Sequence, residues 1–102
     1  MITRIWHGTT RAVDADKYLN FLLEAGVRDY TTTPGNQEVR VWRSIKGDIA
    51  HFWTVSTWDD RDSIKAFAGE DIEKAKYYPE DDDFLLEFEP NVEHYETFVV
   101  KK

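Results

Sequence analysis

The segment IAHFWTVSTW (49–58) carries large apolar side chains at both odd and even positions. Side chains of a β-strand alternate between the two faces of its sheet, so Trp53 and Val55 point one way while Phe52 and Trp58 point the other. A strand with one solvated face would show polar residues at one of these two parities. The sheet that contains this segment therefore needs cover on both faces.

Two other segments with strand character repeat the pattern. QEVRVWRSI (37–45) places Val41 on one face and Trp42 on the other, and ITRIWHGTTRA (2–12) places Ile5 opposite Trp6. Helices of the same chain can cover one face only. We therefore expect a homodimer in which two sheets pack face to face as a dimeric α+β barrel. The alternative is a monomer in which Trp6 and Trp42 are partly exposed.

Helical spacing appears in two regions. In residues 14–30 one face of a helix is apolar, and Asp14 is the predicted N-cap; that face consists of Tyr18, Leu19, Leu22, Leu23 and Gly26. A second region begins with a cap at Asp59, continues to residue 68 and ends at Gly69 in a left-handed conformation. A further short helix is expected from residue 70 or 71 to Pro79, with Ile72, Ala75 and Tyr78 turned inward.

The order of elements then defines the fold class. The predicted strands are 2–12, 37–45, 49–58 and 91–100, with a tight turn at 46–48; residues 81–90 form either a turn of helix near Phe84 or a short extended edge. The order β-α-β followed by β-α-α-β matches the ferredoxin-like split βαβ plan. We expect one α+β domain over residues 1–102, an antiparallel sheet of order 4-1-3-2, and both helical regions on one face.

Composition limits the partners. Residues 1–51 hold 7 Lys and Arg against 6 Asp and Glu, whereas residues 52–102 hold 6 against 14, which gives the net charge of −7. Such an acidic surface repels phosphate backbones, so we expect no nucleic-acid partner. The chain has no Cys, no apolar run of membrane-spanning length and no signal-peptide pattern, and we expect a cytoplasmic protein without a membrane partner.

Nearly the whole chain, about residues 2–98, resembles a known family. The βαββααβ order, WHG on the first strand, WDDRDSIKAFAGED at the junction of strand and helix, and the terminal VEHYE are similar to the antibiotic biosynthesis monooxygenase-like dimeric α+β barrels. The resemblance implies a homodimer with a pocket for a small apolar or aromatic ligand between sheet and helices. It also implies that the broken second helical region covers the mouth of that pocket.

The three histidines His7, His51 and His94 fall on three strands that are neighbours in the expected order. Such a set can bind a transition metal or bracket a substrate if the three parities agree. The spacing matches no recognised ligand motif, so we favour separate polar side chains and expect no bound metal. His7 and His94 are the candidate catalytic acid–base residues.

The resemblance implies cofactor-free oxygenation of a small aromatic or polyketide-like molecule. The protein would need a base, hydrogen bonds and a dry cavity, and the candidate pocket residues are Trp53, Trp58, Phe67, Tyr77 and Arg43. Ordinary core or dimer packing of the tryptophans is the competing interpretation, and Arg4, Arg40 and Arg43 are also candidates for ion pairs across strands.

Two further functions remain open. One is a small-ligand-binding or stress-related dimeric barrel without catalysis. The other is haem binding or degradation, which is disfavoured because the resemblance places His7, Phe67 and Tyr77 where haem-degrading members have Asn, Trp and His. The acidic run of residues 80–83 lacks the ligand spacing of a calcium loop and is expected to be a solvated turn that caps a helix near Phe84.

Overall fold

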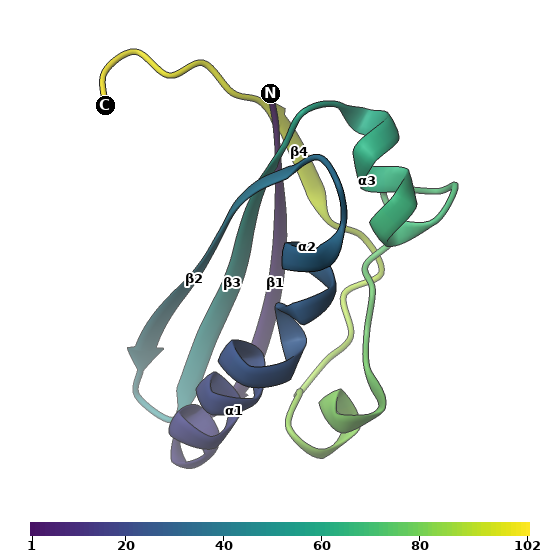
Figure 1. The fold of residues 1–102 in the computed structure, drawn as a ribbon. Coiled ribbons are helices and arrows are strands. Elements are labelled where there is room, and N and C mark those ends of the chain that lie inside the picture. Colours follow the sequence, from purple (N-terminus) through teal and green to yellow (C-terminus); the bar gives the residue numbers. More distant parts are fainter.

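The structure is a computed structural model that describes residues 1–102. Its four strands form one antiparallel sheet in the order β2-β3-β1-β4 (Figure 1), with β1 at Ile2–Arg11, β2 at Asn36–Lys46, β3 at Ile49–Trp58 and β4 at Glu93–Glu96. This is the predicted order read from the other edge. The predicted α+β, ferredoxin-like fold is confirmed.

All helical segments lie on one face of the sheet (Figure 1). An almost continuous helical run precedes β2 and consists of η1 (Ala12–Asp14), α1 (Ala15–Phe21), the π-helical turn η2 (Leu22–Gly26) and α2 (Arg28–Thr32). Helix α3 (Arg61–Ala68) follows β3. The turn between β2 and β3 contains Gly47 with φ of 60°, a conformation that favours glycine, as predicted.

The first helical run differs from the prediction at two residues. Asp14 makes no capping hydrogen bond, and its carboxylate instead accepts from the Arg11 guanidinium at 3.1 Å. Leu23 is 56% exposed, although its spacing placed it on the inner face. The π-helical turn rotates the chain by one extra residue, so that Leu22 and Gly26 are buried and Leu23 points outward.

Helix α3 begins one residue later than predicted. Asp60, not Asp59, is the N-cap, and its carboxylate accepts from the Ser63 backbone N–H at 2.8 Å. Gly69 follows the helix with φ of 93° and ψ of −178°, so its φ is positive but it is not in the left-handed helical conformation that we predicted. Ile64 and Phe67 face the core as expected.

The predicted second helix after Gly69 is wrong. Residues 73–75 instead run antiparallel to residues 90–92, with Ala75 N–H donating to Pro90 O at 2.9 Å and Val92 N–H donating to Glu73 O at 2.8 Å. The buried Arg4 guanidinium donates to two more carbonyls of this segment, those of Ile72 and Lys74. These contacts occupy carbonyls that a helix would need, and a helix this short is marginal without strong packing.

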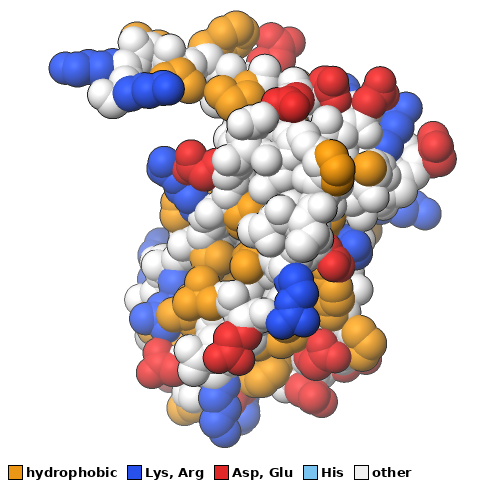
Figure 2. Space-filling model, viewed as in Figure 1, with side chains coloured by type: hydrophobic (Ala, Val, Ile, Leu, Met, Phe, Trp, Pro, Cys, Tyr) orange, Lys and Arg blue, Asp and Glu red, His pale blue; other side chains and the backbone are white.

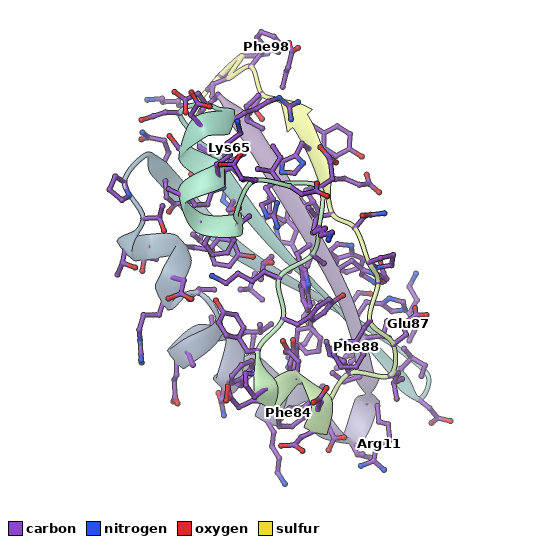
Figure 3. All side chains as sticks on the ribbon, turned by 90° about the vertical axis from the view of Figure 1, so that its right-hand side faces the viewer. Arg11, Lys65, Phe84, Glu87, Phe88 and Phe98 are labelled. Atoms are coloured by element: carbon purple, nitrogen blue, oxygen red, sulfur yellow. The ribbon has the colours of Figure 1, made fainter.

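Pro79 begins a turn of 3₁₀-helix, η3 (Pro79–Asp83), rather than ending a helix. Proline is favoured at a first helical position because its missing N–H would be unpaired there in any case. The Asp81 carboxylate accepts from the Tyr78 backbone N–H at 2.7 Å, which closes the turn. The acidic run therefore forms η3 itself, and no helix or strand follows at residues 84–86. Figure 3 shows this connection along the side of the sheet, with Phe84 and Phe88 on it.

The final strand is shorter than predicted. β4 pairs with residues 2–5 of β1 over four residues, and Thr97 N–H still donates to Met1 O at 3.0 Å. The chain then passes the end of β1 and has no further strand to pair with. Phe98 and Val100 are 77% and 96% exposed. In Figure 2 this tail stands away from the body of the molecule.

The core lies between the sheet and the helices. Even-numbered residues of β1 and β3 face this side, and Trp6 is buried there, contrary to the monomer alternative in which it is partly exposed. Two clusters form the core, one with Trp6, Ala15, Tyr18, Leu22, Ala50, Phe52, Leu85 and Val92, and one with Tyr30, Trp58, Ile64, Phe67 and Ile72. No helix of the chain combines the length and the apolar character needed to cross a bilayer.

Candidate functional site

The uncovered face of the sheet contains the largest hollow. The odd-numbered residues Ile5, His7, His51 and Trp53 of β1 and β3 line it, and Trp42 of β2 lies directly opposite Trp53 in the register of the strands. Its volume is about 500 Å³. Sites for small molecules commonly have volumes of 300–1,000 Å³ and mostly apolar walls with a few polar groups. This hollow therefore has the size of a small-molecule site, but its lining is more polar than usual, because it includes His7, His51 and Glu89.

Two histidines and a glutamate form a hydrogen-bonded series in this hollow. The Glu89 carboxylate lies 2.5 Å from His7 Nδ1, and His7 Nε2 lies 3.0 Å from His51 Nδ1. Trp53 packs against both imidazole rings, with ring centroids 5.2 Å from His7 and 5.8 Å from His51. The array thus brings three polar groups with acid–base chemistry onto one aromatic wall.

Glu89 reaches the array from the long connection before β4. Tyr77 Oη–H donates to the Glu89 backbone carbonyl at 2.6 Å, and the Tyr77 ring packs edge-on against Trp6 and Phe88. Burial and the nearby Glu89 charge raise the pKa of Tyr77, so its hydroxyl stays protonated as a donor. One tyrosine of the Tyr77–Tyr78 pair therefore fixes the backbone that carries Glu89.

His94 lies on the opposite face from His7 and His51, so the three histidines are not gathered in one cluster. Its Nε2 is 3.2 Å from the Arg4 guanidinium and its Nδ1 is 3.4 Å from the Glu73 carboxylate. Burial and the Arg4 charge lower the pKa of His94. His94 of β4 pairs in register with Arg4, which is at an even position of β1. His7 is at an odd position of β1, so His94 and His7 lie on opposite faces of the sheet.

The other predicted pocket residues are also dispersed. Trp58 is fully buried beneath the helices, where its indole N–H donates to Ser56 Oγ at 2.9 Å, and Phe67 stacks against Tyr30 in the same core. Arg43 pairs with Asp16 of the first helical run at 2.8 Å rather than with an acid on a neighbouring strand. Only His7 and Trp53 among the predicted site residues line the hollow.

Arg4 and Arg40 likewise make no ion pair across strands. Arg4 is 1% exposed, and its guanidinium is held by carbonyl groups rather than by a carboxylate. Arg40 pairs with Glu38 of its own strand.

Sequence reasoning left Trp42, His51 and Glu89 out of the site. The alternation of side chains along the strands could have indicated that Trp42 and His51 belong to this face. Nothing local in the sequence indicates that Glu89 reaches His7.

The space between the sheet and the helices is almost filled. Its remaining volume is about 20 Å³, the size of a single water molecule. It lies among Trp6, Leu22, Tyr30, Phe67 and Tyr78. The pocket that the family resemblance implied at this position is therefore closed in this structure, and a ligand of aromatic size would need the connection of residues 69–92 to move.

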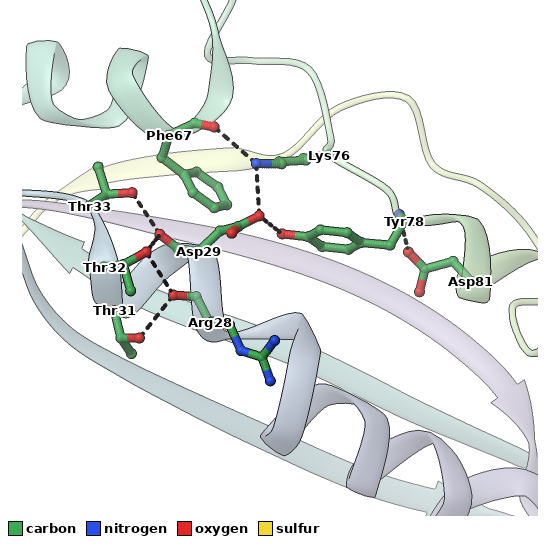
Figure 4. A network of polar contacts seen from close by, with 9 residues as sticks. All are labelled: Arg28, Asp29, Thr31, Thr32, Thr33, Phe67, Lys76, Tyr78 and Asp81. Atoms are coloured by element: carbon green, nitrogen blue, oxygen red, sulfur yellow. Dashed lines mark hydrogen bonds and ion pairs between the residues drawn. The ribbon is translucent and has the colours of Figure 1, made fainter.

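Polar contacts hold that connection against the first helical run (Figure 4). Asp29 accepts from Tyr78 Oη–H at 2.8 Å and from Lys76 Nζ at 3.4 Å. The hydrogen bond from Tyr78 is the main reason that the pKa of Asp29 is lowered. Deeper in the core, Tyr18 Oη–H donates to Asp81 at 2.8 Å, and burial raises the pKa of Asp81. These contacts account for the closed inner space.

No group of three His, Asp or Glu side chains has the arrangement of a metal site in this structure. The acidic residues 80–83 are split between the solvent and the core, because Asp81 turns inward to its two partners while its neighbours are exposed. We therefore build the candidate site on the Glu89–His7–His51 array and its tryptophan walls.

Comparison with solved structures identifies the fold. A protein from Bacillus cereus described as a candidate antibiotic biosynthesis monooxygenase matches with a TM-score of 0.61 and 12% identity, over 99% of this chain and 94% of that chain. A MhuD variant with two manganese protoporphyrin IX molecules per active site matches with a TM-score of 0.61 and 15% identity, over 100% of this chain and 98% of that chain. The haem degrader MhuD from Mycobacterium tuberculosis, with two haems in its active site, matches with a TM-score of 0.57 and 17% identity, over 100% of this chain and 99% of that chain.

These matches show that the chain has the antibiotic biosynthesis monooxygenase-like fold over its whole length, which confirms the resemblance drawn from its sequence motifs. No family model matches the sequence, and no curated protein does. At identities of 12–17% the shared property is the fold. The chemistry has to be argued from this chain's own residues.

Proposed function

We propose that the protein is a cofactor-independent monooxygenase-like enzyme that oxidises a small aromatic or polyketide-like molecule, with the cytoplasm as its predicted location. The observation that carries the proposal is the pairing of His7 and His51 inside a hollow of about 500 Å³ that is walled by Trp42 and Trp53. Flat aromatic walls favour a flat aromatic ligand, and the imidazoles supply acid–base chemistry at its edge.

The reaction class follows from what these residues can supply. A substrate with an activated CH₂ group can lose a proton to an imidazole, and the resulting carbanion can itself reduce dioxygen. The net change is R₂CH₂ + O₂ → R₂C=O + H₂O, in which the substrate provides all four electrons. The protein then needs a base, a binding surface and exclusion of water. The histidines and tryptophans supply the first two, and a second copy packed over this face would supply the third.

We propose further that two copies pack with their uncovered sheet faces together, so that the hollow of each copy is enclosed between the two sheets and Trp42 contributes both to the dimer contact and to the hollow. Trp42 is 48% exposed and Tyr95 is 49% exposed on this face. Large aromatic side chains exposed on an uncovered sheet face are typical of an interaction surface. Sedimentation velocity tests the dimer. Trp42→Glu is expected to give a monomer, whereas the matched control Leu23→Glu, at an exposed position on the helical side, is expected to leave a dimer. A wild-type protein that sediments as a monomer at high concentration would refute the dimer.

Oxygen uptake tests the reaction. We expect uptake with anthrones or hydroquinones that persists in the presence of chelator and is lost in His51→Gln and Trp53→Leu. His94→Gln is the matched control, because His94 lies on the other face of the sheet, and it is expected to retain uptake. Binding without uptake, seen as ligand-dependent quenching of Trp fluorescence, would indicate a binding protein instead. A Soret shift on titration with hemin that is lost in Tyr77→Phe would favour the haem function.

A further inference from the structure

The Glu89–His7–His51 series allows one arrangement of hydrogens when both rings are neutral. An ionised carboxylate only accepts hydrogen bonds, so His7 Nδ1 carries the hydrogen and donates to Glu89. A neutral imidazole has one hydrogen, so His7 Nε2 accepts. His51 Nδ1 must then donate to it across 3.0 Å. The ionised Glu89 carboxylate therefore decides which nitrogen donates and which accepts in both hydrogen bonds of the series.

The last nitrogen of the series is His51 Nε2. It carries a lone pair in this arrangement and makes no hydrogen bond within the chain, while His51 lines the hollow. Nitrogen with a free lone pair at the wall of a site is the requirement for a general base. The Glu89 carboxylate, two groups away at the other end of the series, fixes this tautomer and leaves the lone pair of His51 Nε2 pointing away from the series.

We propose that His51 Nε2 is the proton acceptor of the hollow and that Glu89 and His7 are positioning residues that act through it. This inference rests on the proposed function and deepens it, because it names the substrate class. The ligand is an aromatic compound with an acidic O–H or an activated C–H bond at its edge, which enters as the neutral acid and is bound as its anion against Trp42 and Trp53.

The proton transfer balances without any further reagent. The X–H bond of the substrate breaks, its electron pair stays on X, and the proton joins His51 Nε2 to give an imidazolium. The Glu89 carboxylate stays ionised and compensates the new positive charge through His7. Trp53 lies with its ring nearly parallel to that of His51, at an interplanar angle of 18°, which is a favourable position for a cation over an aromatic face.

Tyr77 holds the backbone of Glu89 in place and so supports the Glu89–His7–His51 series. Its hydrogen bond to the Glu89 carbonyl fixes the backbone of a residue that lies outside any strand or helix. Loss of that bond is expected to loosen Glu89 and so the tautomer of His7, without removing any group that contacts the ligand. Tyr77 therefore belongs to the positioning residues rather than to the walls of the hollow.

Long-range ¹H–¹⁵N NMR of the histidine side chains tests the inference in the unmodified protein. We expect His7 and His51 both to be protonated at Nδ1 with a bare Nε2 at neutral pH. Glu89→Leu is expected to give mixed tautomers at both rings. Glu93→Leu is the matched control, since Glu93 lines the same hollow and makes no hydrogen bond to His7 or His51, and it is expected to leave the two tautomers unchanged. An Nε2–H tautomer of His51 in the wild-type protein would overturn the assignment.

A phenol probe tests the acceptor role without requiring turnover. 4-Nitrophenol is expected to show its phenolate absorption when bound at a pH where free probe is neutral, and His51→Gln is expected to abolish that band. In turnover of an anthrone, His51→Gln is expected to lower kcat/KM by about 10²–10⁴-fold, the usual contribution of a general base. A phenolate band without oxygen uptake would refute the oxygenase function and keep His51 as the base. Oxygen uptake that survives His51→Gln would refute the assignment of the base and keep the function.

Discussion

Gly8 leaves the space that the Trp6 indole occupies, and replacing Gly8 by alanine tests the packing of the core around Trp6. The two residues are on the same face of β1, and the Trp6 indole lies across the space where Gly8 has no side chain. A Cβ at position 8 would lie 2.5 Å from Trp6 Cη2 and 3.1 Å from Leu85 Cδ2. Trp6 is 5% exposed and enclosed by the core, so it cannot turn aside freely.

The expected cost follows from two opposing effects. Overpacking of a core costs about 1–3 kcal/mol, whereas loss of glycine from the unfolded chain stabilises by about 0.4–1 kcal/mol. We expect Gly8→Ala to lower the free energy of unfolding by about 1–2 kcal/mol, which corresponds to a fall in Tm of roughly 5–15 °C for a chain of this size.

Urea unfolding followed by Trp fluorescence measures this change, and a double-mutant cycle with Trp6→Phe isolates its cause. The smaller phenyl ring lacks the atoms that the new Cβ would meet, so Gly8→Ala should cost much less in the Trp6→Phe background. An equal cost in both backgrounds, or a Gly8→Ala protein as stable as the wild type, would show that the contact between Gly8 and Trp6 is not the reason for glycine at this position.

Two further predictions concern buried polar contacts. Tyr18→Phe removes the donor to the buried Asp81 carboxylate and should lower the free energy of unfolding by about 1.5–3 kcal/mol, measured by urea unfolding, because the acceptor stays buried; an unchanged midpoint would contradict this. Because the pKa of His94 is lowered in the folded state by burial and by Arg4, the unfolded chain binds the proton first as pH falls below about 6.5. Stability should therefore decrease on acidification through that region, and His94→Gln should remove this part of the pH dependence; a slope that persists in the variant would assign it to other groups.

The strand framework could be predicted because each strand carries its own local signal. Alternation, turn glycines and helix spacing are properties of short segments, and the fold order follows from them. The same parity argument correctly placed Trp53 and Trp58 on opposite faces of the sheet. Applied to histidines, it would have placed His51 with His7 and His94 on the other face once the register of β1 was known.

The connection of residues 69–92 could not be read in the same way. Its structure depends on contacts from distant residues, above all the Arg4 guanidinium at Ile72 and Lys74 and the pairing of residues 73–75 with 90–92. The apolar residues of this segment do have helical spacing, but the local preference for a helix is weaker than the stabilisation from these tertiary contacts. Glu89 was missed for the same reason, since its contact with His7 spans 82 positions of sequence.

The placement of the ligand is tested most directly by the four indole N–H signals in a ¹H–¹⁵N spectrum of the protein. Trp42 and Trp53 lie on the uncovered face, whereas Trp6 and Trp58 are buried beneath the helices. Titration with an anthrone should shift the signals of Trp42 and Trp53 and leave those of Trp6 and Trp58 in place. Shifts confined to Trp6 and Trp58 would contradict this account, because they would put the ligand between sheet and helices.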